Sequence, residues 1–440
     1  MTDNAKILQL LQNDDPANFQ LAIQLCVGIK GQYGVEVAQE LRRYPYLCLK
    51  NNLELAYWQK QSSLYGNGWP DLPPSIGVLK KLQTLQLEKC TLYQVPAEIG
   101  QLQSLNELNL YNNAIQQIPA EIQSLENLTY LNIASNHLSE FPSEIGQLSQ
   151  LTQLIAYYNL LTSFPTSICK LTQLQTLDLS ENKLYALPPQ IELLEKIVRL
   201  KLVNTQLESL PKEIGKLSCL ENLNLATNQL SYLPDEFTHL ENLRELELKN
   251  NQLQALPKHF GQLKNLRWLN LSYNLKLQSL PDSIVHLENL NELKVINTPF
   301  GDFPKGLGDL QNLNFLHIER CQLNNLPSDI QNLQKLEVLK IINNSLENIP
   351  KELGELASLK ILDLRDNCLQ SIPKELGNLQ SLEHLLLDGN AIKKLPIELW
   401  QLKKLKKMQL SAEHMSPSEI AKFRLLLPEC EIMEIVNYVD

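Results

Sequence analysis

Apolar residues recur along most of this chain at fixed intervals, and Leu105–Leu128 (LNELNLYNNAIQQIPAEIQSLENL) shows one complete unit of the pattern. The apolar positions of this unit are Leu105, Leu108, Leu110, Ile115, Ile118, Ile122 and Leu125. A proline follows Ile118 and has an equivalent in the other units. From Pro73 to Pro257 these prolines recur every 23 residues, one step of 24 leads to Pro281, and 23-residue steps continue to Pro396. So regular a period predicts a solenoid, in which each unit packs only against its neighbours.

The first half of each unit predicts a short β-strand, because its Leu-x-Leu alternation places two leucines on one face and the residue between them on the other. Fifteen such cores begin at Leu82, Leu105, Leu128, Leu151, Leu174, Ile197, Leu220, Leu243, Leu266, Leu290, Leu313, Leu336, Leu359, Leu382 and Leu405. Three residues after the second leucine, most units carry an asparagine, and four carry Thr205, Thr298, Cys90 or Cys321. An asparagine amide can satisfy backbone groups where the chain leaves a strand, so we expect a structural role for this position.

The second half reads Leu-Pro-x-x-Ile-x-x-Leu-x-x-Leu, which predicts a 3₁₀ or short α segment on the convex side, since proline is tolerated at a helix start. The 24-residue step falls at Asn274–Leu277, where one residue is added just after the strand. We expect a local bulge there and an uninterrupted strand ladder.

The two ends depart from the pattern and predict caps. Residues 1–67 contain helical spacing at Ala5–Gln12, Asn18–Gly28 and Val35–Arg43, followed by YLCLKNNLELAYWQ, which partly imitates a repeat. After the repeats at 68–412, residues 413–440 predict a helix capped by Ser416 with Pro417 at its start, then an edge strand at Cys430–Val436. End repeats expose one side of their core, so caps are the expected role; a separate N-terminal binding domain is the alternative.

The consensus LPxxIGxLxxLxxLxLxxNxL resembles the 23-residue leucine-rich-repeat class of bacterial proteins and of the Ras-group-related intracellular proteins of eukaryotes. The resemblance covers about 350 residues. It implies an α/β fold, a right-handed leucine-rich-repeat solenoid (horseshoe) with a parallel concave sheet, and protein binding on the concave face. A related group of secreted effectors carries a cysteine-dependent ubiquitin-ligase domain, but the roughly 30 residues after the last repeat are too few for one.

Charge and composition narrow the partner classes. The 39 Lys+Arg and 49 Asp+Glu give a net charge of −10, which argues against nucleic-acid or anionic-membrane binding. The N-terminus lacks the features of a signal peptide, and no apolar run reaches the length of a membrane span. The eight cysteines show no paired spacing and are interpreted as reduced thiols. We therefore expect a cytoplasmic monomer that needs no cofactor or metal.

Catalytic motifs such as GxxxxGK[ST], GxSxG, HExxH and GxGxxG do not occur. A polar group on the concave face, formed by His317, Asp363 and His384 with Asp366 and Asp388 nearby, is the only enzymatic alternative that we consider. The lysines at 393, 394, 403, 404, 406 and 407 make a basic C-terminal end, for which a solvated rim is the simpler interpretation.

Two groups of aromatic and aliphatic residues stand at strand positions that face outward from the core. The N-terminal group is Tyr111, Tyr130, Ile155, Tyr157 and Tyr158; the C-terminal group is Trp268, Tyr273, Ile296, Phe315, Val338, Ile342 and Ile361. Large exposed apolar patches are rare in monomers, and aromatic residues are enriched at binding hot spots. The alternative is strand propensity with mutual covering by neighbours. The sequence thus predicts a non-enzymatic interaction scaffold, with an exported effector-type or extracellular binding module as the alternative.

Overall fold

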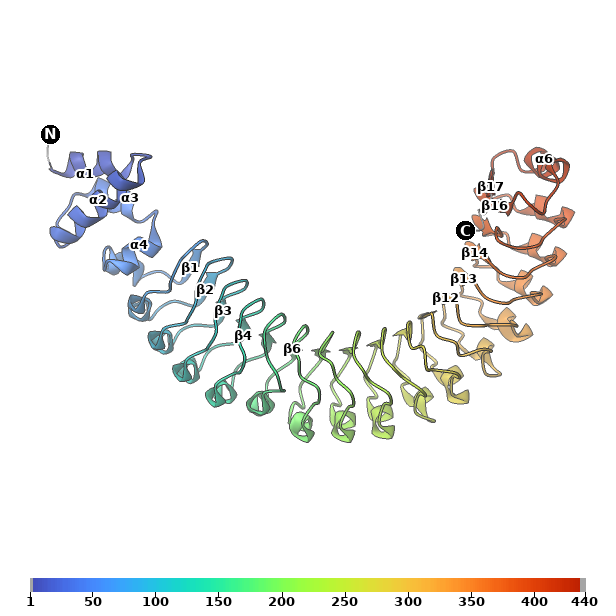
Figure 1. The fold of residues 1–440 in the computed structure, drawn as a ribbon, viewed down its shortest axis with the longest axis horizontal. Coiled ribbons are helices and arrows are strands. Elements are labelled where there is room, and N and C mark those ends of the chain that lie inside the picture. Colours follow the sequence, from blue (N-terminus) through green and yellow to red (C-terminus); the bar gives the residue numbers. More distant parts are fainter. Residues whose placement is uncertain (1–2, 436–440) are drawn as a thin grey trace. The chain divides into compact units, whose positions relative to one another are not determined.

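The computed structural model describes residues 3–435, and the chain forms two compact units. The N-terminal unit runs to Leu184 and includes Leu193–Ile197; the C-terminal unit comprises Tyr185–Glu192 and the chain from Val198 onward. In each unit, parallel strands line one side and short helices the other (Figure 1). The predicted α/β solenoid with a parallel sheet is confirmed.

The N-terminal unit opens with five helices: α1 (Asp3–Leu11), α2 (Pro16–Gly28), α3 (Val35–Leu41), α4 (Pro45–Lys50) and α5 (Leu55–Trp58). The first three lie where helical spacing predicted them. Asp15 caps α2, because its Oδ1 accepts a hydrogen bond of 2.9 Å from the Ala17 N–H. The repeat-like segment YLCLKNNLELAYWQ instead contains α4 and α5, since Pro45 opens a helix there. Ser75 donates a hydrogen bond of 2.5 Å to the carbonyl of Leu49, which ties α4 to the first repeat.

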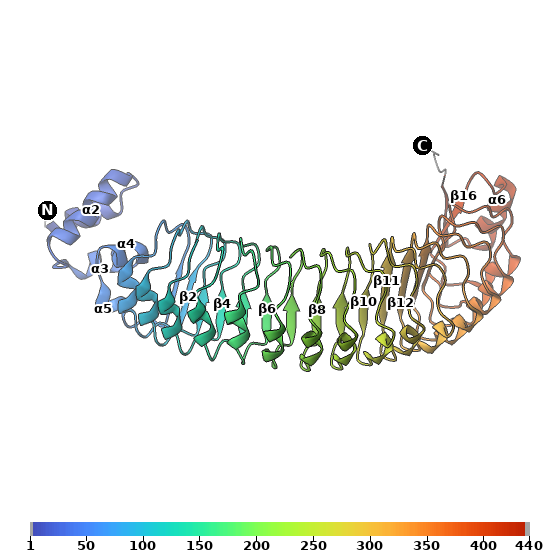
Figure 2. The same ribbon diagram turned by 60° about the horizontal axis from the view of Figure 1, so that its bottom comes forward.

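The strands pair in parallel within each unit, in register at equivalent repeat positions. The N-terminal unit holds β1 (Ser63–Gly66), β2 (Thr84–Leu87), β3 (Glu107–Asn109), β4 (Tyr130–Asn132), β5 (Gln153–Ile155) and β6 (Thr176–Asp178). The C-terminal unit holds β7 (Arg199–Lys201), β8 (Asn222–Asn224), β9 (Glu245–Glu247), β10 (Trp268–Asn270), β11 (Glu292–Ile296), β12 (Phe315–Glu319), β13 (Val338–Ile342), β14 (Ile361–Asp363), β15 (His384–Leu386), β16 (Lys407–Ser411) and β17 (Glu431–Ile435) (Figure 2). All fifteen predicted strands form, and β1 and β17 extend the ladders into the caps.

A 3₁₀ helix follows the proline of each repeat, as its spacing predicts. These helices are η1 (Pro74–Val78), η2 (Ala97–Gln101), η3 (Ala120–Ser124), η4 (Ser143–Gln147), η5 (Thr166–Lys170), η6 (Pro189–Leu193), η7 (Lys212–Lys216), η8 (Asp235–His239), η9 (Phe260–Gln262), η10 (Asp282–His286), η11 (Leu307–Asp309), η12 (Ser328–Asn332), η13 (Lys351–Glu355), η14 (Lys374–Asn378) and η15 (Ile397–Gln401). Between strands and helices, the repeat leucines and isoleucines are almost fully buried. Such burial contributes about 1.5–3 kcal/mol per side chain.

The repeated asparagine joins neighbouring repeats through its amide. In Asn136, Oδ1 accepts a 3.0 Å hydrogen bond from the Ile115 N–H, and Nδ2 donates to the carbonyls of Leu110 and Ile133 at 3.0 and 3.1 Å. Thr205 and Cys321 keep part of this pattern, since the hydroxyl and the thiol each donate to a backbone carbonyl. The position is buried and structural, as predicted.

The added residue of the 24-residue step is extruded. Trp268 of β10 pairs with Glu245 of β9 and with Glu292 of β11, so the ladder continues across the step. Leu275 is 69% exposed while Leu277 is fully buried. The predicted local bulge with a continuous ladder is confirmed.

The helix and the strand predicted near the C-terminal end both form. Helix α6 (Pro417–Leu426) begins with Pro417, and the Ser416 hydroxyl accepts a 3.3 Å hydrogen bond from the Glu419 N–H. Strand β17 pairs with β16 at the predicted edge, and Val436 lies outside the described residues. The eight cysteines all lie within residues 3–435, and none of them forms a disulfide there.

Candidate functional site

The strand-bearing face of the C-terminal unit presents outward residues in three rows, one residue from each strand to a row. The first row contains Glu292, Phe315 and Val338, the second Lys294, His317 and Lys340, and the third Ile296, Glu319 and Ile342. The register of β11, β12 and β13 fixes these alignments. Neighbouring strands lie about 4.8 Å apart, and alternate residues along a strand about 6.6 Å apart, so the rows form a regular grid.

Phe315, Val338 and Ile361 follow one another in the first row of β12, β13 and β14, and we call them the apolar row. Each side chain is partly exposed on a strand whose alternate residues are buried. Glu292 stands between Trp268 and Phe315 in this row. The structure therefore places three of the predicted residues in the same row of consecutive strands, and Glu292 separates Trp268 from them.

Trp268 lies instead beside a charged hollow of about 890 Å³ over β7–β11. Arg244 and Glu221 form an ion pair there, with 3.1 Å between their charged atoms. Burial raises the pKa of the Glu247 carboxyl, although it accepts hydrogen bonds from the Lys249 N–H at 2.8 Å and from Asn270 at 3.0 Å. This part of the face is polar, with one large aromatic at its edge.

Lys294, His317 and Lys340 form the second row, which we call the basic row. His317 Nε2 lies 3.2 Å from a carboxylate oxygen of Glu319. Burial lowers the pKa of His317, Glu319 opposes this shift, and the two lysines add to it. The Lys340 ammonium lies 6.0 Å from the centre of the Phe315 ring. The charge of this row at neutral pH therefore comes from the two lysines.

The third row places Ile296 and Ile342 on either side of Glu319. Tyr273 is joined to β11 by a 2.6 Å hydrogen bond from its N–H to the Ile296 carbonyl. Its ring lies 5.4 Å below the Lys249 ammonium, and its φ is 61°, in the left-handed region. Apolar side chains thus flank the basic row on both sides.

The residues of the enzymatic alternative do not form one cluster, because Lys340 stands between His317 and Asp363 in the second row and His384 lies in the first row. Asp363 accepts two hydrogen bonds from the Arg365 guanidinium, at 2.8 and 2.7 Å, and is almost fully buried. His384 pairs in register with Ile361. Asp388 is 7% exposed, and its Oδ1 has no hydrogen-bond partner among residues 3–435. Burial raises the pKa of the Asp388 carboxyl, and Asp366 and Asp363 add to this while Arg365 opposes it.

The predicted N-terminal group is partly assembled in its own unit. The rings of Tyr111 and Tyr157 lie 6.2 Å apart, and those of Tyr157 and Tyr158 lie 6.1 Å apart. Burial, together with Tyr111, raises the pKa of the Tyr157 hydroxyl. Tyr158 is 59% exposed, and Tyr130 occupies the first row of β4. These tyrosines form a second, more polar aromatic surface.

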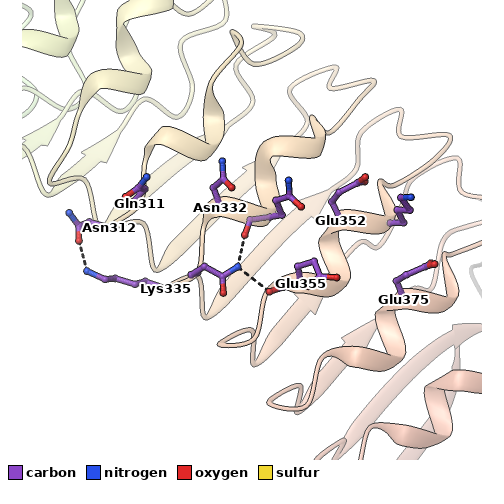
Figure 3. Close-up of a pocket in the computed structure, with 10 residues that line it drawn as sticks. Gln311, Asn312, Asn332, Lys335, Glu352, Glu355 and Glu375 are labelled. Carbon is purple, nitrogen blue, oxygen red and sulfur yellow. Dashed lines mark hydrogen bonds between the residues drawn. The ribbon is translucent and has the colours of Figure 1, made fainter.

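On the helix side, another hollow of about 890 Å³ lies over η12–η14 and is lined by polar residues (Figure 3). Lys335 donates to Asn312 at 2.6 Å, and Gln334 donates to the Glu355 carbonyl at 3.1 Å. Lys335, Asn312 and Gln334 thus already have partners within the chain. In the described part of the chain, no group of three or more His, Cys, Asp or Glu side chains could hold a metal ion. No helix within residues 3–435 is long and apolar enough to cross a membrane.

Lys294 and Lys340 were missed among the predicted site residues, although a signal for them exists. Lys294, His317 and Lys340 are spaced by the repeat length in the same outward position of three consecutive repeats. A comparison of the residue at this position in successive repeats would have predicted the basic row next to the apolar row.

Similarity to known proteins agrees with this architecture. A leucine-rich repeat region profile matches residues 157–256, 249–365 and 343–433, and a second leucine-rich repeat profile matches residues 80–138. No curated protein matches the chain.

Three solved structures show the range of similar proteins. A leucine-rich-repeat protein of Leptospira interrogans is 38% identical, with a TM-score of 0.80, over 86% of this chain and 97% of that one. A plant peptide hormone receptor, solved with its peptide, is 28% identical, with a TM-score of 0.65, over 86% of this chain and 67% of that one. TLR13, solved with a single-stranded RNA, is 25% identical, with a TM-score of 0.67, over 81% of this chain and 56% of that one.

The 23-residue consensus, the ladders of parallel strands, the asparagine bonds between repeats and these similarities agree with one another. The chain belongs to the leucine-rich-repeat family.

Proposed function

We propose that the protein is a non-enzymatic scaffold that binds a protein partner on the strand-bearing, concave face of its C-terminal unit. The apolar row of Phe315, Val338 and Ile361 is the observation that carries this proposal. Three large apolar side chains stand in register on adjacent strands, with Ile296 and Ile342 two rows away. A rigid sheet presents them at little cost in ordering, which favours their use as hot-spot residues.

The family supports a binding role in general terms. The plant receptor named above was solved with a peptide hormone, and leucine-rich-repeat proteins serve as interaction modules. For this chain we propose a protein or peptide ligand, a monomeric state and a cytoplasmic location. The tyrosines of the N-terminal unit would give a second contact surface for a partner large enough to use it.

The test is quantitative affinity capture from a native lysate with the wild-type chain and with the double variant Phe315→Ala, Val338→Ala. Circular dichroism first establishes that both are folded alike. A partner that uses this face should be recovered at least about tenfold less by the variant, because two hot-spot side chains are lost. The matched control is Tyr232→Ala with Trp400→Ala, which removes two exposed aromatic residues away from the candidate face. Equal recovery by all three proteins would show that the C-terminal face is ordinary surface.

The alternative of an exported or extracellular binding module is tested separately. Fractionation of the source cells with an antibody against the chain should find the protein in the cytoplasmic fraction. Detection chiefly in the culture supernatant or in host cells would favour export and would remove the cytoplasmic proposal, without affecting the choice of binding face. Sedimentation of the purified chain tests the monomeric state.

A further inference from the structure

We propose that the face of β11, β12 and β13 recognises an extended acidic segment of the pattern apolar–x–acidic–x–apolar, with the acidic side chain held between Lys294 and Lys340. This inference rests on the proposed function and adds the chemistry of the partner.

The spacing of the rows matches the spacing of side chains on an extended peptide. The apolar row, the basic row and the Ile296–Ile342 row are each two residues apart along the same strands. Alternate residues of any extended chain are about 6.6 Å apart and point to one side. A peptide laid along the strand direction therefore offers residues i, i+2 and i+4 to the three rows. Apolar side chains meet the outer rows, and the middle residue meets the basic row.

Charge selects an acidic residue for the middle position. Several lysines on strand-side edges already have carboxylate partners, such as Lys360 with Glu337 at 2.8 Å and Lys406 with Glu383 at 2.5 Å. Among residues 3–435, neither Lys294 nor Lys340 has a carboxylate within 4.0 Å. One strand lies between them, so their Cα atoms are about 9.6 Å apart, and both flexible side chains can reach one carboxylate above His317.

The surroundings strengthen this contact. Phe315 and Val338 lie on one side of the basic row and Ile296 and Ile342 on the other, so a bound segment would exclude water from the ion pairs. Glu319, the carboxylate within the three rows of β12, is already engaged with His317. Asp363, which stands beside Lys340 in the same row, is engaged with the Arg365 guanidinium. Both ammonium groups are therefore left available to a partner.

The same two lysines favour a peptide over RNA. Affinity for a polyanion grows with the number of phosphates contacted, and the rows offer two ammonium groups bordered by Glu292 and Glu319. Apolar rows on both sides also match peptide side chains better than a sugar–phosphate backbone.

The experiment uses an array of synthetic peptides Gly-Φ-Ser-Z-Ser-Φ-Gly, in which Φ is Ile, Leu, Val, Phe or Tyr and Z is Glu, Asp, Gln or Lys. The fluorescently labelled full-length chain is applied to the array, and affinities of the best peptides are measured by fluorescence anisotropy. Peptides with Glu or Asp should bind about tenfold more tightly than those with Gln and lose this advantage at high salt. Peptides with Lys should not bind.

Two double variants test whether Lys294 and Lys340 cause the preference for acidic peptides. Lys294→Gln with Lys340→Gln should remove the difference between Glu and Gln peptides, whereas the control Lys351→Gln with Lys374→Gln, on exposed helix-side residues, should preserve it. An array without binding, equal binding of Glu and Gln peptides, or a preference that persists in the first variant overturns the proposal. Lysine-dependent binding of a labelled oligouridylate without peptide binding also overturns it. If partner capture is still reduced by the double variant Phe315→Ala, Val338→Ala in those cases, the proposed binding face stands and only its acidic preference fails.

Discussion

Replacement of Asn228 by alanine should destabilise the C-terminal unit more than the same change at Asn251 of the next repeat. Asn228 is 7% exposed, and its Oδ1 accepts hydrogen bonds from the N–H groups of Thr205 at 3.1 Å and Leu207 at 3.0 Å. Asn228 Nδ2 donates to the carbonyls of Leu202 and Leu225. After the substitution both carbonyls still accept a hydrogen bond, from the Thr205 hydroxyl and from Asn251 Nδ2, respectively. Two buried N–H groups are therefore left unpaired. At about 1–3 kcal/mol for each, the loss is roughly 2–6 kcal/mol.

Two matched substitutions in the same unit test whether the loss of stability follows the number of N–H groups left unpaired. In Asn251→Ala only the Leu230 N–H loses its partner, so the cost should be roughly half that of Asn228→Ala. Asn242 is exposed, and its 2.8 Å hydrogen bond to the Ser218 carbonyl can be replaced by water, so Asn242→Ala should cost well under about 1 kcal/mol.

The assay is urea unfolding followed by circular dichroism, with midpoints compared under one condition because long repeat arrays can depart from two-state behaviour. Hydrogen exchange should also show faster exchange at the amides of Thr205 and Leu207 in Asn228→Ala alone. Equal midpoints for Asn228→Ala and Asn251→Ala, or protection unchanged at both amides, would refute the reasoning that unpaired N–H groups set the cost.

Three further changes probe other features. Gly215→Ala should lower the free energy of unfolding by about 1–3 kcal/mol, since a Cβ there would lie 2.1 Å from the Glu236 carbonyl oxygen; an unchanged unfolding midpoint would mean that neighbouring repeats separate easily. Ser416→Ala should cost about 0.5–2 kcal/mol through loss of the α6 cap, measured in the same way, and no loss would show that the Ser416 hydroxyl is replaceable by water. Asp388→Asn should stabilise the chain at pH 7 but not near pH 4. The pKa of the Asp388 carboxyl is raised in the folded chain, so folding is favoured fully only while the carboxyl is protonated, below the unfolded-state pKa of about 3.9, and this stability is lost as pH rises through the folded-state pKa. A difference in midpoint between Asp388→Asn and wild type that does not depend on pH would contradict this.

The repeat fold was predictable from sequence because one physical requirement recurs in every unit. The spacing Leu-x-x-Leu-x-Leu places all three leucines in the core when a turn leads into a short strand. The 23-residue period therefore predicted where the strands and helices lie, and the single 24-residue step predicted the bulge in which Leu275 is exposed. The segment at α4 and α5 was harder to interpret, because its leucines occur at repeat-like intervals while Pro45 directs the chain into a helix.

The candidate site was predictable only in part. The outward positions of Phe315, Val338 and Ile361 follow from alternation, but the break at Glu292 depends on which residues stand opposite across strands. The left-handed backbone conformation of Tyr158 and Tyr273 could not be predicted from the type of residue, because bulky residues rarely adopt this conformation. Their neighbours in the hydrogen-bonded ladder hold them there, and that ladder exists only after folding.

The extruded Leu275 shows where this architecture tolerates a change in length. One residue is added between a buried asparagine and the buried Leu277, yet strand pairing on both sides is preserved. The turn after the strand of this repeat thus accommodates an added residue without disturbing the packed interior. A short epitope tag placed after Leu275 should leave expression and solubility intact, and descendants of this repeat could acquire a surface loop there by gradual lengthening.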